Sequence, residues 1–561
     1  MKNEADVVLV NGSVVTVDPA DRVCQGVAIS GNKILAAGTS DQMKALAGPK
    51  TELIDLKGRS LLPGFIDAHC HAGNYGPVKF NIVCHSDVVR SIEDLKGEIR
   101  KRTASTPKGG WILGRGYDNT KLKEKRHPTR WDFDEAAPEH KVFILRTCGH
   151  LGVLNSLALK EFGIQKGTPD PHGGRIERDK VGEPTGLLYE QALVPARMGT
   201  QPNFEELVRG LKIMNEDFLR YGITSATDAS GRNPEEIRAF QRGAAEGWLQ
   251  VRIYFQVRTS PPSVLLGEKY LQSGLVTGYG NEKLRLGSYK LMLDGAGGGG
   301  SAAMREAYPG KPSDFGILHQ TQEELDKLVL NGQKAGYQIG VHAIGDRAVE
   351  MTLQSFAKAL KKFPRENCRH RLEHCGFLDG PLMEQMREMG VVAALGLPFL
   401  YELGDSYITV FGQDRLQCVY PLRSLMERGI VAGISSDTPV IDPNPLTGIY
   451  FAVTRKTPTG QTIAPQEAVS VRQAIRAYTL SGAYASFEES IKGSIEVGKL
   501  ADLVVLSRDI LKIAPEKILE TKVDLTMVDG NVVYESGKTQ SAESLARSEK
   551  KKRVAGKSGK R

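Results

Sequence analysis

The pattern of apolar and polar positions gives the two ends of the chain a similar character. Up to residue 60, short apolar strands alternate with turns, and Asn11-Gly12 and Gly31-Asn32 lie between β-rich runs. Such dipeptides are strong hairpin signals. The segment from about 490 to 540 shows the same alternation of short apolar strands and turns. Because neither segment is long enough to cover its own apolar faces, we predict that the two pair into one small composite β-sandwich.

Between these ends, apolar strands alternate with amphipathic helices. Helices are expected at 204–221, 235–246, 321–335, 346–362 and 381–389. Eight strands are expected, at 61–71, 223–228, 251–258, 284–293, 338–343, 371–375, 391–397 and 430–437. This alternation predicts an α/β fold, a closed parallel (β/α)8 TIM barrel over residues 61–489.

One long stretch, from about residue 74 to residue 202, interrupts the alternation. Its Gly, Pro and charged content is typical of surface loops. We predict that it is an insertion after the first barrel strand, folded over the barrel mouth as a lid or subdomain.

Composition and charge exclude several classes of protein. An apolar fraction of 40% supports a folded core, and seven scattered cysteines without CxxC spacing argue against a disulfide framework or a zinc ribbon. The net charge is +8, but residues 541–561 carry +6 of it and are expected to form a disordered basic tail. Because the rest of the chain carries a net charge of only +2, we expect no nucleic-acid-binding surface on it. With no signal peptide or long apolar run, we expect a cytoplasmic protein without a membrane partner.

Residues that could bind a metal ion lie at the ends of several of the expected strands. His69 and His71 stand two residues apart, so a strand directs both toward one face, and imidazole suits zinc and related divalent ions. Alone, the pair fits two polar interior histidines equally well. Further strands carry His342, His374 and Asp437 at their ends, and Lys290 lies within another. Burying such a cluster without a cation is costly, so one or two divalent ions are expected.

Several motifs together resemble a known family. The run 62–71, LPGFIDAHCH, resembles the first-strand signature of the amidohydrolase superfamily. Its combination with the lysine-containing strand 289–295, the run 342–346 (HAIGD) and the pair Glu373-His374 is most similar to amidohydrolase family 3, which includes N-substituted formamide deformylases. The resemblance extends over most of the chain.

The resemblance implies a set of metal ligands. His69, His71 and Asp437 would bind one ion, His342 and His374 a second, and a carboxylated Lys290 would bridge them. Zinc is expected, with manganese or iron as alternatives. The alternative to a carboxylated Lys290 is an ordinary cationic lysine in a site with one ion. Asp437 would act as general acid and base in hydrolysis of an amide or related non-peptide C–N bond.

Other residues and other activities stay open at this point. His150 and Tyr75 are candidate substrate-binding residues, Glu190, Asp294 and Asp346 are expected to be structural, and Cys70 and Cys375 are expected to pack. The run 296–301, AGGGGS, lacks the larger side chains of relatives, so it is expected to widen the pocket or loosen the loop.

Three alternative functions remain besides the amidohydrolase. Deaminase relatives carry glutamate where this chain has Gly345, which disfavours but does not exclude deamination. A lactone or ester hydrolase and a non-catalytic binding barrel are the others. The expected partner is a small-molecule substrate, and a homodimer is compatible with the architecture.

Overall fold

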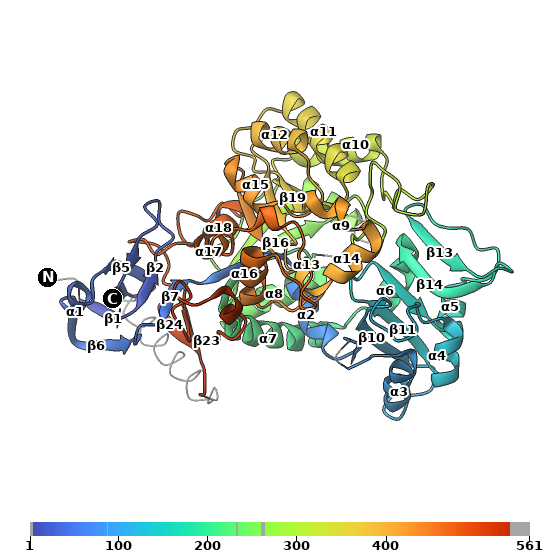
Figure 1. Cartoon of the computed structure of the whole chain (residues 1–561), viewed down its shortest axis with the longest axis horizontal. Coiled ribbons are helices and arrows are strands. Elements are labelled where there is room, and N and C mark those ends of the chain that lie inside the picture. The colour runs from blue at the N-terminus through green and yellow to red at the C-terminus, as the bar shows by residue number, and fades with distance from the viewer. Residues whose placement is uncertain (1–3, 87, 232–233, 260–263, 539–561) are drawn as a thin grey trace.

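The computed structural model describes residues 4–86, 88–231, 234–259 and 264–538, and its centre is a parallel barrel (Figure 1). Neighbouring strands pair in parallel in the order β21-β20-β19-β18-β17-β16-β15-β8. Just beyond β21, the amide of Asp437 donates to the carbonyl of His69 at 2.9 Å, which joins the last strand to the first. The strands are β8 (Phe65–Cys70), β15 (Ile223–Asp228), β16 (Arg252–Arg258), β17 (Leu284–Met292), β18 (Ile339–Ala343), β19 (Arg371–His374), β20 (Val392–Leu395) and β21 (Ala432–Ile434). The predicted eight-stranded barrel is confirmed.

The helices around the barrel follow from amphipathic spacing and from capping. In α7 (Phe204–Arg220), Leu207, Leu211 and Phe218 are buried along one face, and Asn203 caps the first turn. The other predicted helices are α8 (Pro234–Glu246), α10 (Gln322–Lys334), α11 (Asp346–Lys362) and α12 (Gly380–Met389). Further helices are α9 (Val264–Gln272), α13 (Phe399–Glu402), α14 (Gly404–Phe411), α15 (Leu422–Glu427), α16 (Pro445–Thr454), α17 (Val471–Ala477) and α18 (Leu480–Ala485). Within the described residues, no helix combines the length and apolarity needed to cross a bilayer.

The first predicted strand, 61–71, is in fact two strands in different sheets. Strand β7 (Ser60–Pro63) pairs with β22 (Leu503–Leu506) and belongs to the terminal sandwich. The backbone then changes partner: the Gly64 amide donates to the backbone carbonyl of Asp502, and the Phe65 amide donates to the backbone carbonyl of Gly222 beside the barrel. The apolar run is continuous across this change because both strands are buried, so its pattern does not mark the boundary.

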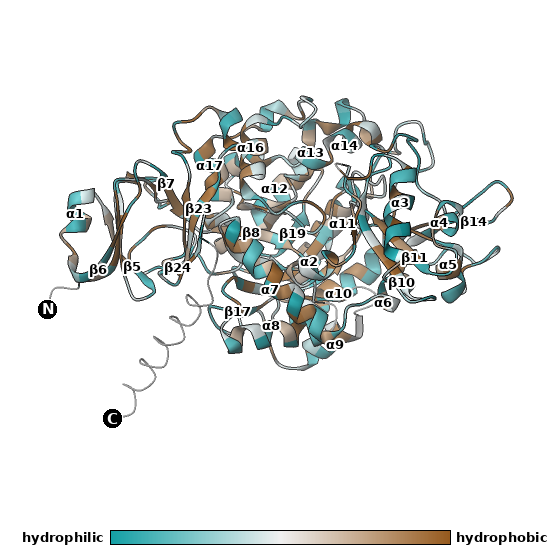
Figure 2. Cartoon of the chain, turned by 90° about the horizontal axis from the view of Figure 1, so that it is seen from below, coloured by the Kyte–Doolittle hydropathy of each residue, from teal (hydrophilic) through white to brown (hydrophobic). Residues whose placement is uncertain are grey.

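The terminal segments form the composite β-sandwich that the sequence predicts (Figure 1, left). One sheet has the order β5-β4-β1-β6 and the other β24-β23-β22-β7-β2-β3. The two sheets enclose an apolar core, which contains Leu9, Val27, Leu61, Leu503 and Met527. Figure 2 shows brown, hydrophobic stretches in the strands of this sandwich. The strands are β1 (Ala5–Val10), β2 (Ser13–Val15), β3 (Val23–Cys24), β4 (Gly26–Ser30), β5 (Lys33–Gly38), β6 (Ala47–Asp55), β23 (Val523–Val528) and β24 (Asn531–Glu535), and α1 (Ser40–Lys44) lies beside them.

The two hairpin signals near the N-terminus have different outcomes. Gly31-Asn32 does join antiparallel neighbours, β4 and β5. Asn11-Gly12 does not form a hairpin, because β1 and β2 lie in different sheets. A Cβ on Gly12 would lie 2.3 Å from Cδ1 of Leu56, so the glycine permits a close approach there. The predicted basic tail, 541–561, lies outside the described residues.

The insertion after the first barrel strand carries its own sheet at the other end of the molecule (Figure 1, right). Its order is β13-β14-β12-β11-β10-β9. Separate apolar clusters cover the sheet's two faces, one containing Phe133 and Ile144 and the other Phe143 and Leu188. Its elements are β9 (Ile82–Val83), β10 (Trp111–Tyr117), β11 (Lys141–Arg146), β12 (Leu151–Leu154), β13 (Gly174–Arg178), β14 (Pro184–Glu190), α2 (Ala72–Val78), α3 (Ile92–Thr103), α4 (Arg130–Ala136), α5 (Ser156–Glu161) and α6 (Val194–Gly199).

A buried ion pair ties the sandwich to the barrel. Arg252 at the start of β16 donates to both carboxylate oxygens of Asp502, at 2.6 and 2.9 Å, and both side chains are almost fully buried. Arg252→Ala is expected to lower the free energy of unfolding by roughly 3–5 kcal/mol, because it leaves a buried carboxylate without its partner. Urea denaturation measures the change.

The matched control for this pair lies on the surface. Arg238 on α8 pairs with Glu235, and its side chain is 65% exposed. Arg238→Ala is expected to leave stability nearly unchanged, since exposed pairs contribute little. Equal losses in the two variants would contradict the importance assigned to the buried pair.

Candidate active site

Three of the predicted ligands converge at the carboxyl ends of the barrel strands. His69 on β8, His374 on β19 and Asp437 after β21 each offer a ligand atom within 4.8 Å of the others, and all three are buried. These residues are far apart in sequence, and the closure of the barrel brings them together. Active sites of (β/α)8 barrels lie at this end.

His71 joins the same group from the position after β8. Its Nε2 lies 3.1 Å from Oδ1 of Asp437, and the Nε2 of His69 lies 3.5 Å from the same oxygen. Burial raises the pKa of Asp437, but the neighbouring His374 and His71 hold it well below its usual range. The carboxylate is therefore ionised and shared between imidazoles.

Left-handed backbone orients two of these residues. His374 has φ of +70° and Asp437 φ of +54°, values that residues with a Cβ seldom adopt. In an extended strand, Glu373 and His374 would face opposite sides. The turn at His374 allows both to reach the barrel interior, where the His374 ring lies 4.8 Å from that of His69. Such strain is retained where the surrounding structure fixes a site.

Lys290 on β17 is buried below this group. Its side chain is 1% exposed, and its Nζ makes no hydrogen bond. Burial lowers the pKa of Lys290 to about 7. An amine in this setting is partly neutral near pH 7, and a buried nitrogen without a partner is costly unless a further group satisfies it.

His342 on β18 lies beside the group but is turned toward a loop. Its ring is 4.5 Å from that of His374, while its Nε2 is 3.2 Å from the carbonyl oxygen of Gly295. Asp294 shapes that loop as expected, accepting hydrogen bonds from the amides of Ile344 and Ala303. His342 therefore lies beside the three residues whose ligand atoms converge, and its own Nε2 is directed at the loop.

Glu373 is a site residue that the sequence analysis named only as part of a motif. Its Oε2 accepts from Nδ1 of His69 at 2.7 Å, and its Oε1 accepts from Arg371 and Gln256 at 2.6 and 2.8 Å. Burial raises its pKa, but Arg371 and His69 hold it well below the usual range. The ionised carboxylate fixes the proton of His69 on Nδ1 and leaves Nε2 for a ligand.

Glu373→Gln is expected to weaken metal affinity by roughly 10- to 100-fold, the usual effect of losing an outer-shell partner of a histidine ligand. The reason is that the neutral amide holds the His69 ring less strongly. Titration of metal-stripped protein with zinc measures the affinity. Glu235→Gln on the exposed surface of α8 is the control. Unchanged affinity in Glu373→Gln would show that His69 needs no such support.

Tyr75 is not where the sequence analysis expected it. Its hydroxyl donates to Asp217 at 3.0 Å, and its ring packs against Phe218 at 5.4 Å, between α2 and α7. It does not line the cavity described below. Tyr75 is turned toward the outer helix layer, and these contacts give no support to its predicted role in substrate binding.

His150 does line the cavity, and it is supported by residues that the sequence left aside. Its Nδ1 lies 2.7 Å from Oε2 of Glu190, and Nε2 of His319 lies 3.4 Å from the same oxygen. Glu190 is thus a partner of two histidines and caps no helix with its side chain. No motif pointed to His319. Asp346 is structural as expected, accepting from the Arg305 amide.

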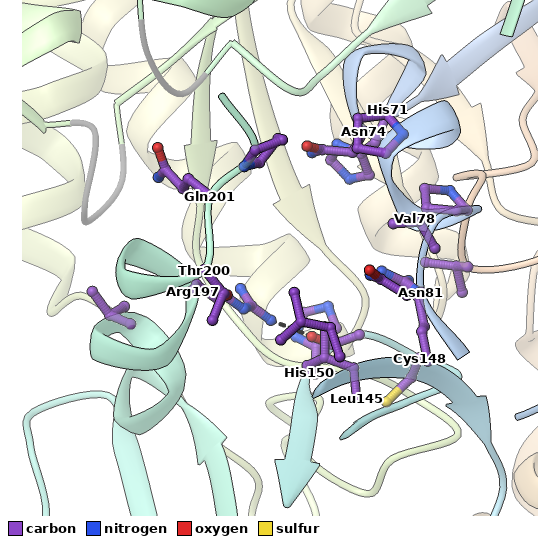
Figure 3. A pocket seen from close by; sticks show the side chains of 18 of the residues that line it. His71, Asn74, Val78, Asn81, Leu145, Cys148, His150, Arg197, Thr200 and Gln201 are labelled. Carbon is purple, nitrogen blue, oxygen red and sulfur yellow. Dashed lines mark hydrogen bonds between the residues drawn. The ribbon is translucent and has the colours of Figure 1, made fainter. Parts of the chain in front are cut away.

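These residues surround a cavity of about 410 Å³ between the barrel mouth and the insertion. Figure 3 shows His71 and His150 on facing walls. Alternate residues of β10 and β11 line the outer wall with apolar side chains, namely Trp111, Leu113, Phe143 and Leu145. Arg115 and Arg197 also line the cavity. It therefore offers a polar inner end and an apolar outer wall to a small molecule.

The glycine-rich loop does not widen this cavity. A Cβ on Gly297 would lie 2.5 Å from the hydroxyl of Tyr407 on α14, and Leu151 and Cys148 approach Gly299 closely. The space left by the missing side chains is thus filled by neighbouring side chains. The expectation of a wider pocket is wrong. Cys70 and Cys375 pack in the core as expected.

Comparison with known proteins agrees with this architecture. Residues 52–534 match the amidohydrolase family. The chain is 29% identical to an N-substituted formamide deformylase of Arthrobacter pascens (95% of this chain, 99% of that protein) and 30% identical to the putative amidohydrolase YtcJ of Bacillus subtilis (91% and 96%).

Solved structures give the same result. A metal-dependent hydrolase of Pyrococcus horikoshii superposes with a TM-score of 0.72 at 26% identity, covering 91% of this chain and 99% of its own. One from Pyrococcus furiosus gives 0.70 at 26% identity, covering 90% and 100%. With its barrel, its composite sandwich and its histidine-rich strand ends, the chain belongs to the amidohydrolase family.

Proposed function

We propose that this protein is a divalent-metal-dependent amidohydrolase that cleaves an amide or related C–N bond other than a peptide bond in a small molecule. The observation that carries the proposal is the convergence of His69, His374 and Asp437 beside a buried Lys290 whose Nζ has no hydrogen bond. The names of similar proteins support it: one is a formamide deformylase and two are metal-dependent hydrolases.

The donor set fits a divalent cation. It combines imidazole nitrogens with carboxylate oxygen, and the buried Nδ1 of His374 makes no hydrogen bond. His69, His71 and Asp437 would hold one ion, His342 and His374 a second. We propose zinc, with manganese or iron as alternatives. A bound ion supplies Lewis acidity, which lowers the pKa of water toward ~7 and polarises a carbonyl group.

Lys290 is proposed to be carboxylated. Its neutral amine, which burial favours at neutral pH, adds to carbon dioxide and releases one proton, so that the product is an anionic carbamate. This anion would satisfy the buried nitrogen and add oxygen ligands between the two sets of histidines.

Asp437 is the proposed proton carrier. Its ionised carboxylate takes a proton from the attacking water as the carbon–oxygen bond forms. It returns that proton to the nitrogen as the C–N bond breaks, so that the leaving amine departs neutral. The apolar wall of Trp111, Leu113, Phe143 and Leu145 would hold an apolar substituent of the substrate and keep water out.

Deamination remains disfavoured, now for a steric reason. A Cβ on Gly345 would lie 1.9 Å from the carbonyl oxygen of Ala303. The position at which deaminase relatives carry a glutamate therefore has no room for a side chain. We therefore propose hydrolysis of an amide-type C–N bond rather than hydrolytic deamination.

Metal analysis and an activity screen test the proposal. Purified protein is expected to contain divalent metal, to lose activity on chelation and to regain it with zinc or manganese. The substrates are formamides, N-acyl amino acids, cyclic amides and lactones. Turnover of lactones alone would overturn the C–N assignment. Absence of bound metal and of activity after metal addition would favour a binding protein.

A further inference from the structure

We propose that the substrate carries a carboxylate close to the scissile C–N bond, and that Arg115 and Arg197 bind this carboxylate. The inference rests on the proposed function, because it names the class of amide that the site accepts. That class is the N-acyl derivatives of α-amino acids with apolar side chains. In such a compound the carboxylate and the side chain both leave the carbon that is bonded to the amide nitrogen.

The two guanidinium groups meet at one residue of the cavity wall. An Nη2 atom of Arg197, on α6, donates a hydrogen bond to the carbonyl of Gly149. A Cβ on Gly149 would lie 3.0 Å from Nη2 of Arg115, on β10. Both arginines line the cavity, and both are partly buried. Because a guanidinium group stays charged in proteins, the pair concentrates positive charge at this point of the wall.

This point of the wall lies next to the histidines of the barrel mouth. Gly149 directly precedes His150, whose ring is 5.3 Å from that of His342. Figure 3 shows Arg197 and His150 on the side of the pocket away from His71. A group bound by the arginines is therefore one residue along the wall from His150. This position suits a substituent on the atom next to the scissile bond.

Arg115 continues a row of apolar side chains on β10. Trp111, Leu113 and Arg115 alternate along the strand and all line the cavity, so their side chains share one face. Phe143 and Leu145 of β11 line the cavity beside them, in register with Leu113 and Arg115. Two residues of a strand span about 7 Å. A side chain that packs against Leu113 is therefore within reach of a carboxylate at Arg115, as in an apolar amino acid.

Two carboxylates that line the same cavity contact other groups. Glu190 lies 2.7 Å from Nδ1 of His150 and 3.4 Å from Nε2 of His319. Glu206 accepts a hydrogen bond from the backbone amide of Asn203 at 2.9 Å, at the start of α7. Like charges repel, so a substrate carboxylate is directed away from these acids and toward the guanidinium pair. The forked N–H groups of arginine match the two oxygens of a carboxylate.

Two compounds that differ in one carboxylate test the inference. N-Formylphenylalanine combines a formyl amide, a carboxylate and an aromatic side chain, and N-formylphenethylamine lacks only the carboxylate. The metal-loaded wild type is expected to prefer the acid by at least about 100-fold in kcat/KM, because a site built to bind a polar group rejects the analogue without it. Equal kcat/KM values for the two compounds would overturn the inference.

Arginine variants assign this preference to residues. Arg115→Gln and Arg197→Gln are each expected to lower kcat/KM for the acid by about 10- to 100-fold, the effect of losing a hydrogen bond to a charged group. Each should leave kcat/KM for N-formylphenethylamine within a few-fold of wild type. Arg115→Lys keeps the charge but not the fork, so it should lose less than Arg115→Gln. Equal losses for both compounds would show a structural effect and overturn the assignment.

Arg130→Gln is the matched control. Arg130 lies on α4 of the same insertion, pairs with Glu183 at 3.4 Å and does not line the cavity. Its replacement should leave the ratio of the two kcat/KM values unchanged, and a fall like that of the cavity variants would contradict the proposal. Metal content and Tm of Arg115→Gln and Arg197→Gln are expected to stay near wild type. The two variants are measured separately, so one of them decides the question if the other fails to fold.

A binding measurement separates this inference from the proposed function. If wild type hydrolyses neither compound, N-formylphenylalanine stays intact and calorimetry gives its Kd for the zinc-loaded protein. The Gln variants should raise that Kd by about 10- to 100-fold and leave the Kd of N-formylphenethylamine unchanged. If no C–N substrate of the activity screen is hydrolysed, the proposed function fails while this measurement still decides the role of the arginines. Absence of binding to wild type, or an unchanged Kd in the variants, would overturn the inference.

Discussion

Asp437→Asn is expected to lower kcat by about 10⁴-fold, the upper end of the range for general acid–base catalysis, while the protein stays folded. Asparagine has nearly the shape of aspartate, so the hydrogen bond from the backbone N–H of residue 437 to the carbonyl of His69, which closes the barrel, is retained. The side-chain amide of asparagine cannot take a proton from water. It also lacks the negative charge of Asp437 Oδ1, which lies 3.1 Å from Nε2 of His71 and 3.5 Å from Nε2 of His69. Steady-state kinetics on the best substrate, with Tm, measure both effects.

The control for this variant is Asp442→Asn. Asp442 is an exposed carboxylate five residues further along that accepts from Tyr221. Its replacement should leave kcat unchanged. Normal kinetics in Asp437→Asn would remove Asp437 from the proton transfer and leave that role to another group.

Lys290→Ala is expected to abolish activity and to lower metal content together. The loss should exceed the roughly 10- to 100-fold that follows removal of an outer-shell partner, because Lys290 is proposed to be a ligand. Metal per chain by elemental analysis and kcat are measured on the same samples. If a carbamate is present, acetate or propionate should occupy the vacated space and restore part of both.

Lys283 provides the matched control, because it directly precedes β17, the strand that carries Lys290. Its Nζ donates to the carbonyl of Gln250 at 2.7 Å, away from the cavity. Lys283→Ala should retain metal and kcat. Full metal content in Lys290→Ala would rule out the bridging role, and absence of rescue by carboxylates would favour a plain cationic lysine.

The sequence predicted most of the barrel because the information is local. Each strand is an apolar run, and each helix has a buried face with an apolar residue every three or four positions, as in α7. Where the pattern was ambiguous, the prediction failed. The run 61–71 is apolar throughout although it changes sheets at Gly64, and Asn11-Gly12 is a hairpin dipeptide in a connection between sheets.

The candidate site divides in a similar way. His69, His71, His374 and Asp437 were expected to lie together because parallel strands end at one rim. Tyr75 was misplaced because nothing local shows that α2 turns its ring toward α7. Glu190 was expected to be structural and His319 was not singled out, since the contacts of Glu190 with His150 and His319 depend on how the insertion lies over the barrel.

By itself the sequence determined which segments are strands and helices, and which chemical groups stand at the strand ends, because periodicity and position along a strand are properties of neighbouring residues. The tertiary structure alone decided which of those groups meet. Glu373 contacts His69 across 304 residues of sequence, and His150 contacts Glu190 across 40. Such contacts depend on the register of distant strands and on backbone turns such as that at His374, which no local pattern encodes.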